Sequence, residues 1–147
     1  MKRTVLSVLL VISLLLVFSC KTQQPAPAPV EATFSQIFER YAGALILDGA
    51  TTYTVVAGNT LSGISHSVYD GNGFFYPVIM LANSDTVTDM DKIQLDQELI
   101  IPDLEANLAD DGARTAIKGF LLEVADLVSS RGLEDTAQGL RDLSDSL

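Results

Sequence analysis

Two short segments rich in β-branched and aliphatic residues, 52–56 and 99–101, are the feature that most constrains how this chain can fold. Such segments predict β-strands, and Pro102 ends the second because proline cannot donate to a strand ladder. A sheet of two strands is unstable by itself in water and needs a helical layer on one face. The residues between the two segments are therefore expected to supply helices.

Those intervening residues carry two helix signals separated by a loop at Gly71–Gly73. Either Asn59 or Thr60 can cap the first helix, because either side chain can accept an orphan backbone N–H. Pro77 suits the first turn of the second helix, where a missing N–H costs nothing. Residues 84–92 are polar and without periodicity, so we expect a long loop there. The buried stripes of the two helices are expected at Leu61, Ile64, Val68, Val78, Ile79, Leu81 and Ala82.

The pattern of these residues resembles the LysM domain over essentially the whole length of that domain, here residues 50–103. The resemblance implies a strand–helix–helix–strand fold that binds N-acetylglucosamine-containing glycans, such as peptidoglycan or chitin, without catalysis. The matching residues are Tyr53, Val55, Gly58, Asn59, Thr60, Leu61, Ser62, Ile64, Ala82, Asn83, Ile93, Asp96, Gln97, Leu99, Ile101 and Pro102.

In that family the sugar lies in a shallow groove between the loop after the first strand and the loop before the second. Three departures from the family bear on the groove: Asn59 replaces an aspartate, Leu95–Asp96 replaces a Pro-Gly turn, and Tyr76 stands where tryptophan is common. A LysM fold with weak or lost sugar binding is the alternative. The implied glycan-binding residues are Gly58, Asn59, Thr60, Leu61, Ile93, Gln94, Leu95 and Asp96.

The N-terminal segment predicts export and lipid anchoring. Lys2 and Arg3 precede an apolar run, Val5–Phe18, that is short for a membrane span and typical of a signal peptide. Cys20 follows as in a bacterial lipobox, which implies a lipoprotein signal peptide at 1–19 and lipidation of Cys20; an ordinary signal peptide with a chance cysteine is the alternative. Residues 20–31 form a linker in which alternating prolines favour an extended spacer, although a disordered tail is also compatible.

Helices are expected on both sides of the central block. Apolar residues at helical spacing predict an amphipathic helix over 32–48, joined directly to the first strand. The tail, 104–147, predicts a helical hairpin that follows an acidic connector at 103–111 and turns at Arg131–Gly132. The apolar stripes of the tail need a partner, which is either the rest of the chain or another protein, including a second copy.

Charge and residue counts exclude several classes of function. The formal net charge of −10 disfavours nucleic acid as a partner, because an acidic surface repels phosphates. A single cysteine excludes an intrachain disulfide and any cysteine-based metal cluster. His66 is the only histidine and is expected at the surface or half-buried, so we expect no metal and no cofactor. No segment offers an enclosed acidic cleft or a nucleophile set, so we expect no enzyme activity.

The sequence therefore predicts an α+β fold: a small LysM unit with two helices on one face of an antiparallel two-stranded sheet, flanked by an N-terminal helix and a C-terminal helical hairpin. The predicted function is non-catalytic peptidoglycan binding by a lipoprotein anchored in the bacterial cell envelope, facing the periplasm or the wall. One alternative is an envelope assembly factor that uses the LysM unit as a scaffold and binds a protein through its tail. Another is a subunit that targets a separate hydrolase to the wall.

Overall fold

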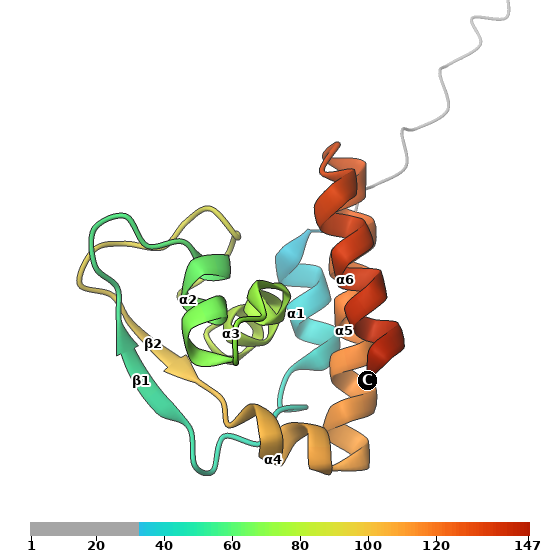
Figure 1. Ribbon diagram of the computed structural model, residues 1–147, viewed down its shortest axis with the longest axis horizontal. Coiled ribbons are helices and arrows are strands. Elements are labelled where there is room, and N and C mark those ends of the chain that lie inside the picture. Colours follow the sequence, from blue (N-terminus) through green and yellow to red (C-terminus); the bar gives the residue numbers. More distant parts are fainter. Residues whose placement is uncertain (1–32) are drawn as a thin grey trace, which may run out of the picture. The chain divides into compact units, whose positions relative to one another are not determined.

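The computed structural model describes residues 33–147, and within this range one two-stranded sheet is combined with six α-helices and one 3-10 helix (Figure 1). The predicted signal peptide, Cys20 and the linker lie outside the described residues. The fold class is α+β, as predicted. The elements in chain order are α1 Phe34–Tyr41, β1 Thr51–Thr54, α2 Leu61–Val68, the 3-10 helix η1 Gly73–Phe75, α3 Tyr76–Ala82, β2 Glu98–Ile101, α4 Leu104–Ala109, α5 Asp111–Ser130 and α6 Glu134–Ser146.

The sheet pairs β1 with β2 in antiparallel register, with Tyr53 opposite Leu99 and Thr51 opposite Ile101. Leu99 and Ile101 are buried, whereas the alternating residues of β2 face outward. Both α2 and α3 lie between the strands in the chain, and α3 packs against both α2 and β2. The predicted strand–helix–helix–strand order is therefore present. The 3-10 helix η1 begins at Gly73, the last residue of the loop expected at Gly71–Gly73.

The two helices between the strands begin where the sequence predicts. Thr60 caps α2 by accepting from the Gly63 N–H at 3.1 Å, which satisfies one of the orphan donors of the first turn. Leu61 and Ile64 of α2 are buried in the core, and Val68 at the end of α2 is half-buried against the same core. Pro77 lies in the first turn of α3, as expected for a residue without an N–H.

Asn83, the residue after α3, holds β2 to that helix. Its amide NH₂ donates to the carbonyls of Ile79 and Ile100, and its side-chain oxygen accepts from the Ile100 N–H, each at 2.8 Å. The N–H and carbonyl of Ile100 point away from β1. The side chain of Asn83 pairs with both groups, as a third strand would at this point. The side chain is 7% exposed, and a buried backbone pair without such a partner would be costly.

The predicted helix over 32–48 is correct only in its first part, because α1 ends at Tyr41. Thr33 and Gln36 form a capping box at its start, and Gly43 follows its end with φ +73°. The chain then runs to β1 without regular structure rather than joining it directly. Asn107 of α4 holds this segment: its side chain exchanges two hydrogen bonds of 2.8 Å with the backbone N–H and carbonyl of Ile46.

The tail contains the predicted hairpin, in which α5 and α6 pack against each other across the Arg131–Gly132 turn. The expected acidic connector is wrong in one respect, because residues 104–109 form α4, capped by Asp103. The apolar stripe of α5 is buried against α1, α3, α4 and α6, so packing within the chain is confirmed. Its fully buried members are Ile117, Phe120, Leu121, Val124 and Val128.

Polar contacts between α1 and α5 reinforce this packing. Arg40 and Tyr41 both donate to the Glu123 carboxylate, the tyrosine at 3.0 Å. The Arg40 hydrogen bond, with a smaller contribution from Tyr41, holds the pKa of Glu123 below its usual value. Tyr41 also lies edge to face with Phe120, with ring centroids 5.3 Å apart. In Figure 1, α1, α5 and α6 lie together on the side of α2 and α3 that faces away from the strands.

Asn83→Ala is expected to lower the free energy of unfolding by about 2–4 kcal/mol, because it removes three side-chain hydrogen bonds and leaves the part-buried N–H and carbonyl of Ile100 without protein partners. Urea unfolding followed by circular dichroism measures this change. The matched control is Gln138→Ala, which removes an exposed amide whose described bond is to Asp142 on the surface. The control should change stability by less than about 0.5 kcal/mol. Equal effects of the two substitutions would mean that Asn83 does not hold β2.

Candidate functional site

The two predicted glycan-binding loops begin at the same end of the sheet. Beyond the last residues of the strands, the Val55 N–H donates to the Gln97 carbonyl at 2.9 Å, and the Val55 carbonyl accepts from the Asp96 N–H at 2.9 Å. The chain then diverges into the loop that leads to α2 on one side and the loop from α3 on the other. Figure 1 shows both loops at the upper left, where β1 ends and β2 begins.

The first loop, residues 56–60, is braced from within by Asn59. The Asn59 side-chain oxygen accepts from the Val56 N–H at 2.9 Å and from the Tyr53 hydroxyl at 3.1 Å. An aspartate could accept the same bonds, so the asparagine preserves this bracing without a charge. Thr60 rather than Asn59 caps α2. Leu61 is 2% exposed, so its side chain belongs to the core and not to the surface of the loop.

Gly58 in this loop has φ +85°, a conformation that side chains with a Cβ rarely adopt. A Cβ built there would have no heavy atom within 4 Å. The backbone conformation therefore accounts for glycine at this position, and the space over it is open. A ligand can approach the main chain of Gly58 closely.

The second loop, residues 93–96, contains one half-buried and three exposed residues. Ile93 packs against the core, whereas Gln94, Leu95 and Asp96 are exposed. The Gln94 N–H donates to the Gln97 side-chain oxygen at 2.9 Å, which closes the turn. Asp96 has φ +63° and, together with Gln97, faces the single residue Val55. This is the hydrogen-bonding pattern of a β-bulge, in which the left-handed position usually carries glycine.

Asp96 therefore occupies a left-handed backbone conformation that glycine adopts without steric cost. Aspartate is one of the few residues with a Cβ that tolerate this conformation.

An exposed apolar pair lies at the point where the loops diverge. Val56 is 55% exposed and Leu95 is 63% exposed. Val56 is adjacent in the chain to Val55, and Leu95 is adjacent to Asp96, which donates to the Val55 carbonyl. Val56 was not among the predicted site residues. The alternation of strand residues carried the signal for it, because Val55 is buried and its neighbour must face the other way.

The candidate site carries little charge. Asp96 is the one acidic residue among the eight predicted. In the core, burial raises the pKa of Tyr69 and of Tyr76. Tyr76 is buried in the core, and its hydroxyl has no hydrogen-bond partner among the described residues. His66 is exposed on α2, as expected.

Two further features bear on the chemistry of residues 33–147. Within that range there is no group of three or more His, Cys, Asp or Glu side chains placed to hold a metal ion. Within the same range, none of the helices combines the length and the apolar character needed to cross a membrane. The candidate site offers main-chain polar groups, the carboxylate of Asp96, uncharged polar side chains and two exposed aliphatic residues.

Comparisons of the chain with protein-family models, with curated proteins and with solved structures found no match.

Asp96→Gly is expected to raise the free energy of unfolding by about 0.5–1 kcal/mol, because glycine adopts a positive φ without steric cost. The matched control is Asp85→Gly in the preceding loop, where φ is not positive. That change should leave stability unchanged or lower it by up to about 1 kcal/mol, since glycine adds entropy to the unfolded chain. Thermal and urea unfolding measure both. A lower stability for Asp96→Gly would contradict the left-handed turn.

Proposed function

We propose that residues 50–103 are a LysM-type unit that binds the N-acetylglucosamine-containing glycan of peptidoglycan, and that the whole chain is a lipoprotein that tethers a membrane to the cell wall. The observation that supports this most is the meeting of the two candidate loops at one end of the sheet, where the main chain of Gly58 is accessible and the side chains of Val56 and Leu95 are exposed. The residue pattern shared with the LysM family supports the same function.

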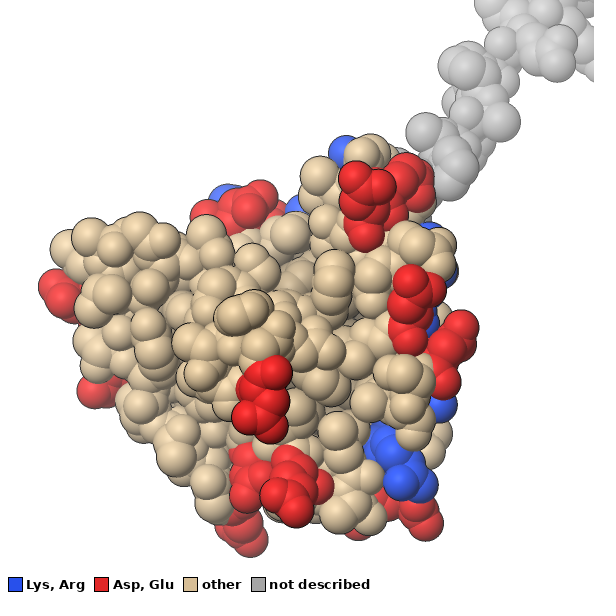
Figure 2. Space-filling view, viewed as in Figure 1, with Lys and Arg blue, Asp and Glu red and all other residues tan. Residues whose placement is uncertain are grey.

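The chemistry of these loops suits an acetamido sugar. Main-chain N–H and carbonyl groups can pair with the amide of the acetamido group, and aliphatic side chains can cover its methyl group and the apolar face of the ring. Figure 2 shows that the surface at the upper left, above the loops, is mostly uncharged, while acidic side chains gather over the helices on the right and below. Attraction must then come from short-range contacts rather than charge.

The expected affinity follows from these contacts. A net hydrogen bond is worth about 0.5–1.5 kcal/mol, and a handful of them less the cost of association gives a Kd of about 1 mM to 1 µM. The net charge of −10 adds no attraction for an anionic wall polymer. Binding should therefore be insensitive to salt or improve slightly as repulsion is screened.

Membrane attachment in this proposal depends on Cys20 and places the folded part in the periplasm or at the wall. Lipid chains on that cysteine would hold the protein at the membrane, and residues 21–32 would separate the folded part from it. An envelope assembly factor is the alternative. It gains no specific support from the tail, because most residues of the apolar stripes on which it depended are buried within the chain.

Val56→Ser and Leu95→Ser are each expected to weaken binding of N-acetylglucosamine oligomers about three- to tenfold, because they remove exposed apolar cover without disturbing the core. Titration calorimetry with soluble oligomers and peptidoglycan fragments at two salt concentrations measures this. Gly58→Val should also reduce binding, since valine at positive φ strains the loop.

The matched control is Leu133→Ser, which removes a leucine with 41% exposure in the α5–α6 turn. It should leave glycan affinity unchanged. If the control lost as much affinity, the glycan would bind elsewhere on the protein. If binding were abolished by added salt, the ligand would not be an uncharged glycan held by short-range contacts.

Cys20→Ala is expected to abolish incorporation of labelled fatty acid and to release the protein from membranes, because multiple acyl chains at about 0.8 kcal/mol per buried CH₂ supply the anchoring. Labelling in bacterial cells followed by membrane fractionation measures both effects. A Ser19→Thr variant controls for disturbance of the export signal. Continued acylation of the Cys20→Ala chain would exclude the lipoprotein assignment while leaving the glycan proposal intact.

A further inference from the structure

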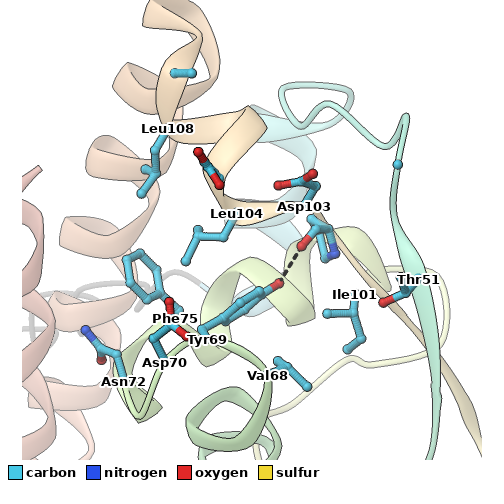
Figure 3. Close-up of a pocket in the computed structure, with 14 residues that line it drawn as sticks. Thr51, Val68, Tyr69, Asp70, Asn72, Phe75, Ile101, Asp103, Leu104 and Leu108 are labelled. Carbon is cyan, nitrogen blue, oxygen red and sulfur yellow. Dashed lines mark hydrogen bonds between the residues drawn. The ribbon is translucent and has the colours of Figure 1, made fainter.

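A pocket of about 880 Å³ lies at the end of the sheet opposite the candidate loops (Figure 3). Thr51 at the start of β1 and Ile101 at the end of β2 are paired and form one wall. The turn after α2 and helix α4 supply the others. This volume falls within the range of about 300–1,000 Å³ that is usual for sites of small ligands.

The floor of the pocket is apolar and held in place. Tyr69 and Phe75 meet edge to face, with ring centroids 5.9 Å apart, and both are buried. The Tyr69 hydroxyl donates to the Pro102 carbonyl at 3.0 Å, which ties the ring to the end of β2 (Figure 3). The apolar lining consists of Val68, Tyr69, Phe75, Ile101, Pro102, Leu104, Leu108 and Ala109.

The charged side chains that line the pocket are all acidic, and the neutral polar ones are Thr51 and Asn72. Asp70, Asp103 and Glu105 line the pocket and are exposed, and no lysine or arginine is among the described residues that line it. Arg114, at the start of α5, instead donates to the Leu108 carbonyl and pairs with Asp111. Asp103 also caps α4 through the Ala106 N–H at 3.0 Å, so its position relative to the floor is defined. In Figure 3, Asp70 and Asp103 lie on opposite sides of the Tyr69 ring.

We propose that this pocket binds a primary ammonium group on an aliphatic chain, as presented by a lysine side chain of a peptide. An anionic ligand would be repelled by the three carboxylates, and a purely apolar ligand would gain nothing from them. A lysine side chain matches both features, since its stem can lie on Tyr69 and Leu104 while its ammonium pairs with one of the carboxylates and is attracted by the others at longer range. The aromatic floor adds cation–π attraction for the same group.

This site shares no residue with the candidate glycan loops, so it goes beyond the proposed function. The two sites lie at opposite ends of the same pair of strands. Failure of glycan binding leaves the pocket proposal standing, and failure of lysine binding leaves the glycan proposal standing.

The experiment uses the full chain, isotope-labelled and held in phosphatidylcholine nanodiscs, with amide chemical shifts followed by NMR. The probe is a short blocked peptide with one lysine, and the matched peptides carry norleucine or acetylated lysine at that position. The lysine peptide should shift the amide signals of the pocket residues, and the matched peptides should not. Cadaverine forms a separate arm, which distinguishes a free diamine from a peptide side chain.

The decisive variant combines Asp70→Asn, Asp103→Asn and Glu105→Gln. Asparagine preserves the helix cap at 103 and tolerates the φ of +47° at 70, so the fold should persist and is checked by thermal unfolding. The control combines Glu39→Gln, Asp85→Asn and Asp145→Asn, three exposed acids outside the pocket. The pocket variant should bind the lysine peptide about tenfold more weakly, and the control should stay within about twofold.

Four results would overturn the proposal. The norleucine peptide could bind as well as the lysine peptide, which would make the pocket simply apolar. The amide shifts could fall outside the pocket, which would place the binding site elsewhere. The two triple variants could lose affinity equally, which would assign the effect to net charge. Binding of cadaverine without binding of the peptide would exclude a peptide lysine as the ligand.

Discussion

Two buried asparagine side chains hold the parts of this protein that a two-stranded sheet cannot hold by itself. Asn83 and Asn107 each pair with both backbone groups of one residue, Ile100 and Ile46, and each also donates to the carbonyl four residues earlier. A carboxamide can do this because it carries a donor and an acceptor side by side, as a peptide group does. Each asparagine side chain thus pairs with the backbone of an extended segment as a neighbouring strand would, although the asparagine itself belongs to a helix or follows one.

The helical layers depend on this arrangement. Asn83 joins β2 to α3, and α3 packs in turn against α5, so the sheet is connected to the tail through one helix. Asn107 joins α4 to the chain between α1 and β1, which brings the N-terminal and C-terminal helical segments together. The flanking helices are therefore part of the same core as the sheet, rather than additions to a unit that is already complete.

Local signals predicted much of this structure, and contacts across the chain account for what they missed. Thr60 and Pro77 marked helix starts because capping depends only on adjacent residues. Leu61 and Ile64 showed their burial through spacing alone. The end of α1 near Gly43, the helix α4 within an acidic stretch and the role of Asn107 were not predictable in this way, because partners such as Ile46 are distant in sequence. At the candidate site, the left-handed turn at Asp96 was not predicted, because aspartate signals a positive φ less clearly than glycine does. The exposure of Val56 was not predicted either.

The shortness of the sheet has a consequence for the behaviour of this protein at high concentration. Of the two outer edges of the sheet, the one on β2 is blocked at Ile100 by Asn83, whereas β1 has no further strand beside it in the described chain. An open edge is a template for pairing between molecules, and such pairing leads to aggregation. Here the open edge is only four residues long and carries Thr52 and Thr54 with exposed side chains. Its brevity and the mutual repulsion of acidic molecules act together to keep neighbouring copies from joining their sheets.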